Sequence, residues 1–278
     1  MNTKKVWFVT GASKGLGFSL VKKLVAEGYS VAATTRTAKN LETEIGMADN
    51  FLALGMKLTD EQSVNDAVAR TITRFGKLDV VVNNAGYGKV GALEELTDQE
   101  ARENFDVNVF GALNVIRSVM PHLRRQGSGH IINVASIAGI LGSFPGFGVY
   151  CATKFAMAGF TESLAAEAAE LGVRATVVYP GYFRTNFLDN RSLQLPQHPV
   201  AAYTAVRNSE HWHETEMKGN QPGNPEKAAE AFVQLAEMER PPLHFVMGTD
   251  AFGMARGKLN ALDEALKANE TLSKSTDF

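Results

Sequence analysis

Short apolar runs alternate along this chain with segments in which apolar residues recur every three or four positions, the two patterns of strands and helices. The runs that predict strands are Val6–Thr10, Ser30–Thr35, Phe51–Met56, Asp79–Val82, His130–Ala135, Arg174–Tyr179 and His244–Met247. They are rich in Val, Ile and Phe and mostly lack polar alternation, which is typical of parallel strands covered on both faces. The segments that predict helices lie near 16–27, 61–75, 98–126, 150–170 and 225–238.

Repeated strand–helix units imply right-handed crossovers and a doubly wound sheet. In such sheets, ligands bind beyond the carboxyl ends of the strands. No internal repeat or linker rich in Pro, Gly and Ser divides the sequence. We therefore predict an α/β fold in which a doubly wound, mostly parallel seven-stranded sheet forms one domain over residues 1–278.

The stretch 183–224 breaks this rhythm, with only short helical signals between the sixth strand and the last predicted helix. A connection of that length inside a compact domain is usually functional. We predict a substrate-binding lid here; the alternative is a poorly ordered surface excursion. The lid is favoured because the whole connection between Tyr179 and Pro225 carries the aromatic residues Tyr182, Phe183, Phe187, Tyr203 and Trp212. Residues 270–278 are expected to form a frayed tail.

Composition narrows the class of protein. Of 278 residues, 45% are apolar, and 28 basic residues against 30 acidic ones give a formal charge of −2. That balance predicts no strong field for nucleic acid or an anionic membrane. The first apolar run is too short for a signal peptide, and no later segment approaches a membrane span. We expect a cytoplasmic protein with a small-molecule ligand.

The first strand runs directly into Gly11-Ala-Ser-Lys-Gly15-Leu-Gly17 and then into an amphipathic helix. Glycine permits a tight turn and close backbone approach, and the helix N-terminus offers free N–H groups to a pyrophosphate. Glycine clusters alone are weak evidence, but this placement on both sides predicts a dinucleotide site. The residues assigned to it are Gly11, Ser13, Lys14, Gly15, Leu16 and Gly17.

The end of the second strand indicates which dinucleotide binds. Enzymes that prefer NAD usually place an acid here to bind the ribose 2′-hydroxyl. This chain has Thr35 and Arg36 instead, with Lys14 in the glycine turn. Two cations and no acid suit a 2′-phosphate, so we predict NADP(H). The alternative is that both cations are solvated surface residues.

Several motifs, taken together, resemble the short-chain dehydrogenase/reductase family, in its NADP-preferring carbonyl reductase, hydroxysteroid or retinol dehydrogenase-like branch. The likeness covers about residues 4–185 and rests on Thr10-Gly-Ala-Ser-Lys-Gly-Leu-Gly17, Asn83-Asn-Ala-Gly86, Ser136, Tyr150-Cys-Ala-Thr-Lys154 and Pro180-Gly181. The resemblance implies a Rossmann fold. It also implies further cofactor contacts from Leu58, Asn84, Ala85, Gly86, Pro180, Gly181 and Thr185.

Chemistry can be argued directly for the pair Tyr150 and Lys154, which lie one helical turn apart and share a face. A nearby ammonium favours the phenolate and can lower the pKa of a tyrosine, which could then exchange a proton with a carbonyl oxygen or an alcohol. The resemblance adds Lys154 as a ligand of the nicotinamide ribose, Ser136 as a second donor to the carbonyl oxygen, and Asn108 as holder of a relay water. The alternatives are a helix cap for Ser136 and a structural role for Asn108.

Two departures from the family pattern bear on detail. Ser136 and Tyr150 are 14 positions apart where the family usually has 13, which predicts an extension near 142–148 at the substrate mouth. Lys57 stands before Leu58 where the family often has an aspartate that contacts adenine. The C-terminal third lacks the glycine-rich ending of many tetramers. The resemblance favours at most a homodimer, through 98–126 and 150–170.

The leading hypothesis is an NADP(H)-dependent oxidoreductase that reduces a ketone or aldehyde, with an apolar or bulky substrate suggested by Phe144 and Phe147. A non-catalytic NADP(H)-sensing protein is the alternative, and an epimerase or dehydratase of the extended branch is less favoured. His211 and His213 are two apart and point to different sides of a helix, so no metal site is predicted. Cys151, the single cysteine, is interpreted as a small filler.

Overall fold

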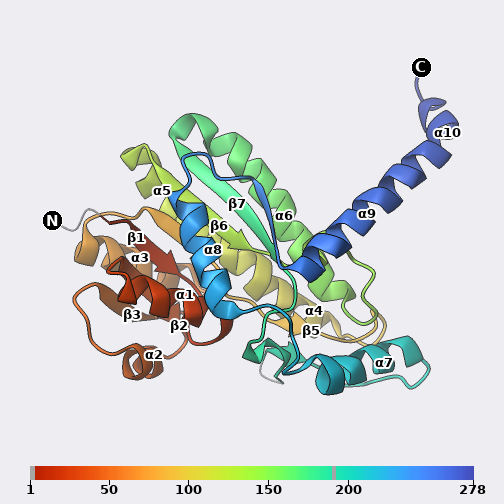
Figure 1. The fold of residues 1–278 in the computed structure, drawn as a ribbon, viewed down its shortest axis with the longest axis horizontal. Helices are drawn as coiled ribbons and strands as arrows, with labels where there is room; N and C mark the ends of the chain where they lie inside the picture. The colour runs from red at the N-terminus through yellow and green to blue at the C-terminus, as the bar shows by residue number, and fades with distance from the viewer. Residues whose placement is uncertain (1–3, 190–191) are drawn as a thin grey trace.

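The computed structural model describes residues 4–189 and 192–278 and contains a seven-stranded sheet with the order β3-β2-β1-β4-β6-β7-β9. Every neighbouring pair in this sheet is parallel, which confirms the predicted doubly wound α/β fold (Figure 1). Each of the seven predicted runs forms a strand. The strands are β1 (Val6–Val9), β2 (Ser30–Thr35), β3 (Phe51–Gly55), β4 (Val80–Asn83), β6 (Gly129–Val134), β7 (Val173–Pro180) and β9 (His244–Met247).

Helices cover both faces of the sheet. The five predicted helical segments are all present, although 98–126 is divided by a π-helical turn, η1 (Asp106–Phe110), into α4 (Asp98–Phe105) and α5 (Gly111–Gln126). The other principal helices are α1 (Gly15–Ala26), α2 (Ala38–Ile45), α3 (Glu61–Phe75), α6 (Gly148–Ala168), α7 (Thr204–Trp212), α8 (Pro225–Glu237), α9 (Thr249–Ala268) and α10 (Glu270–Lys274). Short turns are η2 (Ile137–Gly139), η3 (Ala169–Leu171), η4 (Asn186–Leu188) and η5 (His213–Met217).

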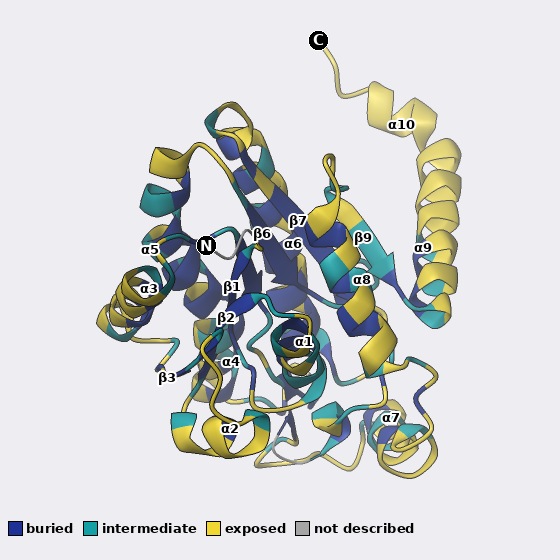
Figure 2. Ribbon diagram, turned by 60° about the vertical axis from the view of Figure 1, so that its left-hand side comes forward, coloured by how far each residue is buried: buried dark blue, intermediate teal, exposed yellow. Residues whose placement is uncertain are grey.

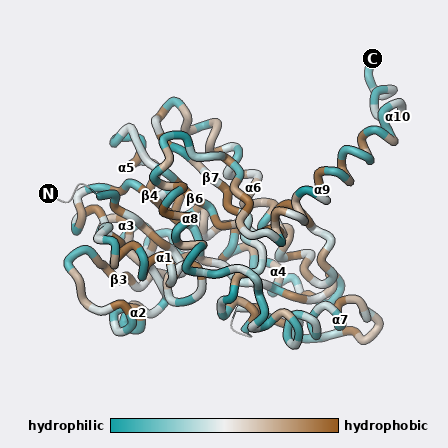
Figure 3. The backbone as a smooth tube through the Cα atoms, in the orientation of Figure 1, coloured by the Kyte–Doolittle hydropathy of each residue, from teal (hydrophilic) through white to brown (hydrophobic). Residues whose placement is uncertain are grey.

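Alternate side chains of each strand enter opposite cores, as the pleat requires. In β1, Trp7 and Val9 pack with α1 and α8, whereas Phe8 packs with α3, α5 and α6 on the other face. The central strands are therefore buried on both sides (Figure 2) and apolar along their length (Figure 3). This double burial explains why their sequences lack polar alternation.

Local signals fix several helix ends. Asp60 caps the N-terminus of α3 by accepting from the backbone N–H groups of Gln62 and Ser63, and Gly76 ends that helix in the left-handed conformation. Thr97 and Glu100 form a reciprocal capping box at the start of α4. These caps lie at the ends predicted for the helical segment 61–75 and at the start predicted for 98–126.

The chain between β7 and α8 contains more regular structure than the sequence indicates. It includes η4, α7, η5 and a two-residue strand, β8 (Leu193–Gln194), which pairs in parallel with β5 (Gly88–Lys89) beside the main sheet. A single bridge between Phe183 and Gly223 draws the two ends of this connection together. We name residues 183–224 the β7–α8 segment.

The C-terminus also departs from expectation. Helix α9 leaves the body and projects away from it, and α10 lies at its far end (Figure 1). Residues 270–274 are thus helical where a frayed tail was expected, although all of them are exposed. None of the helices in the described ranges is both long and apolar enough to cross a membrane.

Candidate active site

A cavity of about 700 Å³ lies beyond the carboxyl ends of the central strands, where the strand order reverses between β1 and β4. The glycine turn after β1 forms one wall. Gly11 adopts a φ of 66°, and a Cβ there would lie 2.7 Å from the Cα of Ala85. Glycine is thus required both by conformation and by the close approach of the loop after β4.

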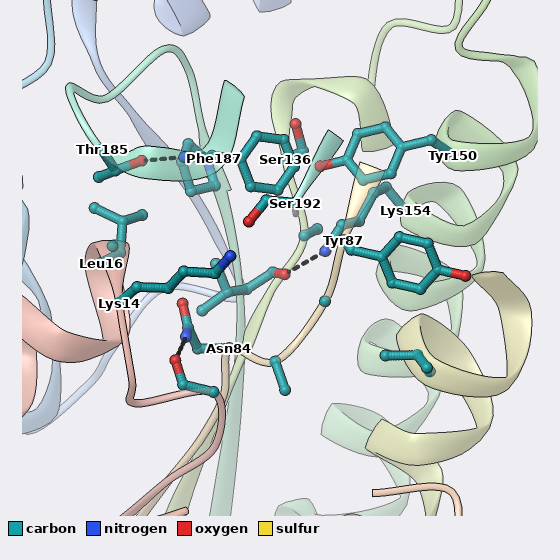
Figure 4. A pocket seen from close by; sticks show the side chains of 18 of the residues that line it. Lys14, Leu16, Asn84, Tyr87, Ser136, Tyr150, Lys154, Thr185, Phe187 and Ser192 are labelled. Atoms are coloured by element: carbon teal, nitrogen blue, oxygen red, sulfur yellow. Dashed lines mark hydrogen bonds between the residues drawn. The ribbon is translucent and has the colours of Figure 1, made fainter. Parts of the chain in front are cut away.

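Side-chain hydrogen bonds also connect the glycine turn to the loop after β4. The Asn84 amide donates to the backbone oxygens of Thr10 and Gly11 at 3.0 and 3.1 Å (Figure 4). The Thr10 hydroxyl accepts from the backbone N–H groups of Asn84 and Ala85. No side chain caps the N-terminus of α1, so its N–H groups and its positive dipole end remain directed at the cavity. This arrangement fits a pyrophosphate.

The end of the cavity formed by β2 and β3 is basic. Lys14, Thr35, Arg36 and Leu58 all line it, as the sequence predicts, and Lys57 adds a third cation. The two acids that line the cavity, Glu103 and Asp106, come from the α4–η1 stretch instead. The carbonyl oxygen of Leu58 already accepts a hydrogen bond of 3.0 Å from the amide of Asn114.

Ser136, Tyr150 and Lys154 meet at the other end of the cavity. Ser136 is the second residue after β6, whereas Tyr150 and Lys154 lie on one face of α6, both almost fully buried. The Lys154 Nζ atom is 5.7 Å from the Tyr150 ring centroid and donates to the Val134 carbonyl oxygen at 2.9 Å. The Tyr150 hydroxyl points toward Ser136 (Figure 4). An ammonium has three donors, so Lys154 retains capacity for a ligand.

Burial dominates the electrostatics of this group. It raises the pKa of Tyr150 despite an opposing hydrogen bond from Ser136, and it lowers the pKa of Lys154 to about 8. The sequence led us to expect a lowered pKa for the phenol, whereas in this pocket burial disfavours the phenolate and raises the pKa. Tyr150 is held as the protonated phenol, the form that can donate a proton.

Asn108 lies in the π-helical turn η1 and does not line the cavity. Its amide donates to the Tyr87 carbonyl oxygen and the Thr153 hydroxyl at 3.0 and 3.1 Å, and its oxygen accepts from the Tyr87 backbone N–H. A Cβ on Gly86 would lie 3.0 Å from the Asn108 oxygen and 3.6 Å from the Lys154 Nζ atom. Asn108 thus adjoins Lys154 through Gly86, but its own polar atoms are engaged by protein groups.

Aromatic side chains form the wall facing Tyr150. Phe187 and Phe147 lie with ring centroids 6.1 and 6.3 Å from that of Tyr150, and Phe144 also lines the cavity. Phe144 and Phe147 belong to the loop before α6, where the longer Ser136–Tyr150 spacing predicts an extension at the substrate mouth. Tyr203 and Trp212 do not line the cavity, so only part of the aromatic set in the β7–α8 segment reaches it.

His213 is a cavity residue that the sequence did not identify. Its Nδ1 atom lies 2.7 Å from the Ser209 carbonyl oxygen, which can only accept, so Nδ1 carries the proton. Nε2 is then an acceptor, and the Tyr182 hydroxyl donates a hydrogen bond to it at 2.9 Å. Burial lowers the pKa of His213, which favours this neutral form. His211 is exposed and takes no part.

All predicted site residues other than Gly17 and Asn108 line this one cavity. Gly17 lies directly behind the turn, against the Gly11 carbonyl oxygen. Sequence reasoning did not assign several further lining residues, among them Thr34, Thr59, Tyr87, Ser192, Gln194 and Gln221. Thr34, Thr59 and Tyr87 adjoin residues that the sequence assigned to the site, whereas Ser192, Gln194 and Gln221 have no motif around them.

A doubly wound sheet, a glycine turn at its switch point and a Tyr–Lys pair in the same cavity define a Rossmann-type nucleotide-binding oxidoreductase. Residues 5–195 match the family model described as short chain dehydrogenase. The chain belongs to this family. It is 34% identical over 273 residues to "Oxidoreductase BOA17" of Botryotinia fuckeliana, covering 94% of this chain and 96% of that protein.

Solved structures agree in fold. A short-chain dehydrogenase from Streptomyces avermitilis is 35% identical, with a TM-score of 0.90 and complete coverage of both chains. A short chain dehydrogenase from Burkholderia cenocepacia, solved in complex with NADP, is 28% identical with a TM-score of 0.73, covering 96% of this chain and 97% of that one. A 3-ketoacyl-(acyl-carrier-protein) reductase from Brucella melitensis, complexed with NADH, is 27% identical with a TM-score of 0.70, covering 87% and 95%.

Proposed function

We propose that this oxidoreductase reduces a ketone or aldehyde to an alcohol with NADPH, reversibly. The observation that carries the proposal is the convergence of Ser136, Tyr150 and Lys154 on the cavity that the glycine turn enters. The bound nicotinamide would supply or accept the hydride. The residues of this chain supply orientation and the proton.

Tyr150 is the proposed general acid. The phenol is protonated at neutral pH and can therefore donate to a carbonyl oxygen that gains negative charge as hydride arrives. The hydroxyl of Ser136, at the end of β6, is proposed to donate to the same oxygen. Lys154 is proposed to hold the nicotinamide ribose through the donors that Val134 leaves open.

Family membership does not choose between the two nicotinamide cofactors, since solved relatives hold both NADP and NADH. The choice rests on Lys14 and Arg36, joined by Lys57 at the β2–β3 end of the cavity. A 2′-phosphate carries up to two negative charges and accepts charge-assisted hydrogen bonds from such cations. We propose NADP(H) on this ground.

The substrate is proposed to be an apolar or bulky carbonyl compound that the β7–α8 segment covers as a lid. Phe144, Phe147 and Phe187 supply the apolar wall next to Tyr150. Ser192, Gln194 and Gln221 add polar groups from the same segment. Ligand sites of this kind combine a mainly apolar lining with few polar groups that orient the ligand.

The test is titration of the purified protein with NADPH and NADH, followed by a panel of ketones and aldehydes monitored at the nicotinamide absorbance. NADPH is expected to bind more tightly than NADH, and bulky apolar ketones are expected to be reduced fastest. Tight NADPH binding without turnover on any carbonyl would refute the proposed reaction. Preference for NADH would refute the role of Lys14 and Arg36.

A further inference from the structure

Helix α9 presents an apolar stripe that its own body leaves uncovered. Phe252, Leu259, Leu262 and Leu266 are 56%, 58%, 50% and 64% exposed, far more than leucines and phenylalanines on a core-facing helix. Together with the buried Ala255 they occupy positions 252, 255, 259, 262 and 266, at alternating intervals of three and four residues. That 3-4-3-4 spacing is the seam of two packed helices.

The stripe begins inside the molecule and continues out of it. Ala251 and Ala255, at the base of α9, are buried against Ile137 and the side chains around it. From Leu259 onward every residue of the helix is exposed, so no described part of the body covers the later positions (Figure 1). The exposed part of α9, residues 259–268, is shorter than the roughly 12–15 residues below which an unpacked helix is marginal in water, so packing of its apolar face would stabilise it.

We propose that the stripe of α9 packs antiparallel against the α9 stripe of a second copy of this chain. In this register Leu259 faces Leu262 of the second copy, and Leu266 reaches the base of the helix beside Phe252. The two leucine contacts repeat by symmetry, as a twofold interface requires. The helix dipoles oppose each other, which also favours the antiparallel arrangement.

Charge on the flank of the stripe agrees with this partner. Arg256 and Asp263 lie on the same side of the seam, one heptad apart. The antiparallel register brings Arg256 near Asp263 of the second copy, twice per dimer. Asp263 also pairs with Lys267 one turn along its own helix at 2.6 Å, and a carboxylate can accept from both.

A membrane surface is a poorer partner for the same stripe. Between 249 and 274, four basic residues (Arg256, Lys258, Lys267 and Lys274) are balanced by four acidic ones (Asp250, Asp263, Glu264 and Glu270). Interfacial helices that bind anionic lipids instead carry an excess of Lys and Arg on the polar face. The balanced charges favour a protein partner with the same balance, which a second copy provides.

The proposal is tested by measuring the molar mass of the full chain in solution by light scattering. The protein concentration is varied over a range of about 1 to 100 µM, because self-association depends on protomer concentration. The wild type is expected to have at least twice the 30.1 kDa of one chain. The double variant Leu259→Glu with Leu266→Glu is expected to lose half of the wild-type mass. A wild-type monomer at the highest concentration, or an unchanged mass in the variant, overturns the proposal.

Three further variants make the test specific. Ala268→Glu adds a charge to the opposite face of the same helix and is expected to leave the mass unchanged, with the melting temperature of each variant as the folding control. Arg256→Glu is expected to weaken self-association, and adding Asp263→Arg is expected to restore it. Failure of the second change to restore the mass overturns the antiparallel register. None of these residues lines the proposed active site, so the result is independent of the proposed function.

Discussion

The two ends of the active-site cavity differ in whether backbone groups or side chains form them. The end that fits the nucleotide consists of strand termini, the glycine turn and the N-terminus of α1, so its shape is set by the backbone. The end that faces Tyr150 is built from the side chains of the loop before α6 and of the β7–α8 segment. A backbone site tolerates little change at its glycines, whereas a side-chain site can be remodelled to admit other substrates. The proposed nucleotide site therefore lies at one end of the cavity and the proposed substrate selectivity at the other.

The largest expected effect is at Tyr150. Tyr150→Phe removes the proposed proton donor and keeps the ring that contacts Phe147 and Phe187, so turnover should fall by about 10²- to 10⁴-fold. NADPH affinity should stay unchanged. Steady-state kinetics on the best ketone of the panel and a fluorescence titration with NADPH measure the two quantities. Tyr203→Phe, outside the cavity, is the matched control, and near-full turnover in the Tyr150 variant would exclude the assigned acid.

The second effect concerns the buried charge of Lys154. Its folded-state pKa of about 8 lies below the ordinary 10.5 because burial disfavours the ammonium. Between these values the unfolded chain binds more protons than the folded one, so the free energy of unfolding should rise with pH across that window. Relative to Lys154→Met, which has no proton to lose, the wild type should gain on the order of 3 kcal/mol from pH 8 to pH 10.5.

Urea unfolding of both proteins at several pH values measures this difference, and comparison with the variant cancels the titration of other groups. A constant difference in stability across the window would mean that Lys154 keeps its ordinary pKa. The buried ammonium would then be more hydrated or better paired than its contact with Val134 indicates.

The third effect is a difference between NADPH and NADH in affinity for the nucleotide end of the cavity. Arg36→Glu should weaken NADPH binding by about 10- to 100-fold, since a hydrogen bond to a charged group contributes about 1.5 to 3 kcal/mol. NADH binding should change little, because NADH lacks the 2′-phosphate. Dissociation constants of both cofactors measure the ratio. Arg70→Glu, an exposed position on α3, is the control, and equal losses for both cofactors would contradict the assigned contact.

The contrast between the two ends also explains how far the sequence could be interpreted. The strands and the nucleotide end were predictable because burial on both faces, glycine geometry and helix starts leave local signals, as in β1 and the turn from Gly11 to Gly17. The helix α9 and the contact of His213 were not. His213 reaches the cavity only through the fold of a segment whose course depends on long-range packing, such as the pairing of β8 with β5. The direction of the Tyr150 pKa shift was also missed, since it depends on burial in three dimensions.

The smallest expected effect tests whether the hydrogen bond between Tyr182 and His213 helps to position the β7–α8 segment. Tyr182→Phe removes the 2.9 Å hydrogen bond to His213, which joins the residue after Gly181 to the β7–α8 segment. A net contribution of about 1 kcal/mol predicts a rise in KM of about fivefold, with kcat and NADPH affinity unchanged. His213→Phe should have a similar effect, because it leaves the Tyr182 hydroxyl without its acceptor.

A double-mutant cycle sharpens this prediction. Replacing both partners by phenylalanine leaves no buried polar group unpaired, so the combined variant should lose less than the sum of the two single losses. The steady-state KM for one ketone in the four proteins gives the interaction free energy. Strict additivity would show that Tyr182 and His213 act independently and that apolar packing alone positions the segment. A sub-additive result would show that this hydrogen-bonded pair helps to position the segment at the substrate end of the cavity. At the nucleotide end, by contrast, the backbone sets the shape of the site.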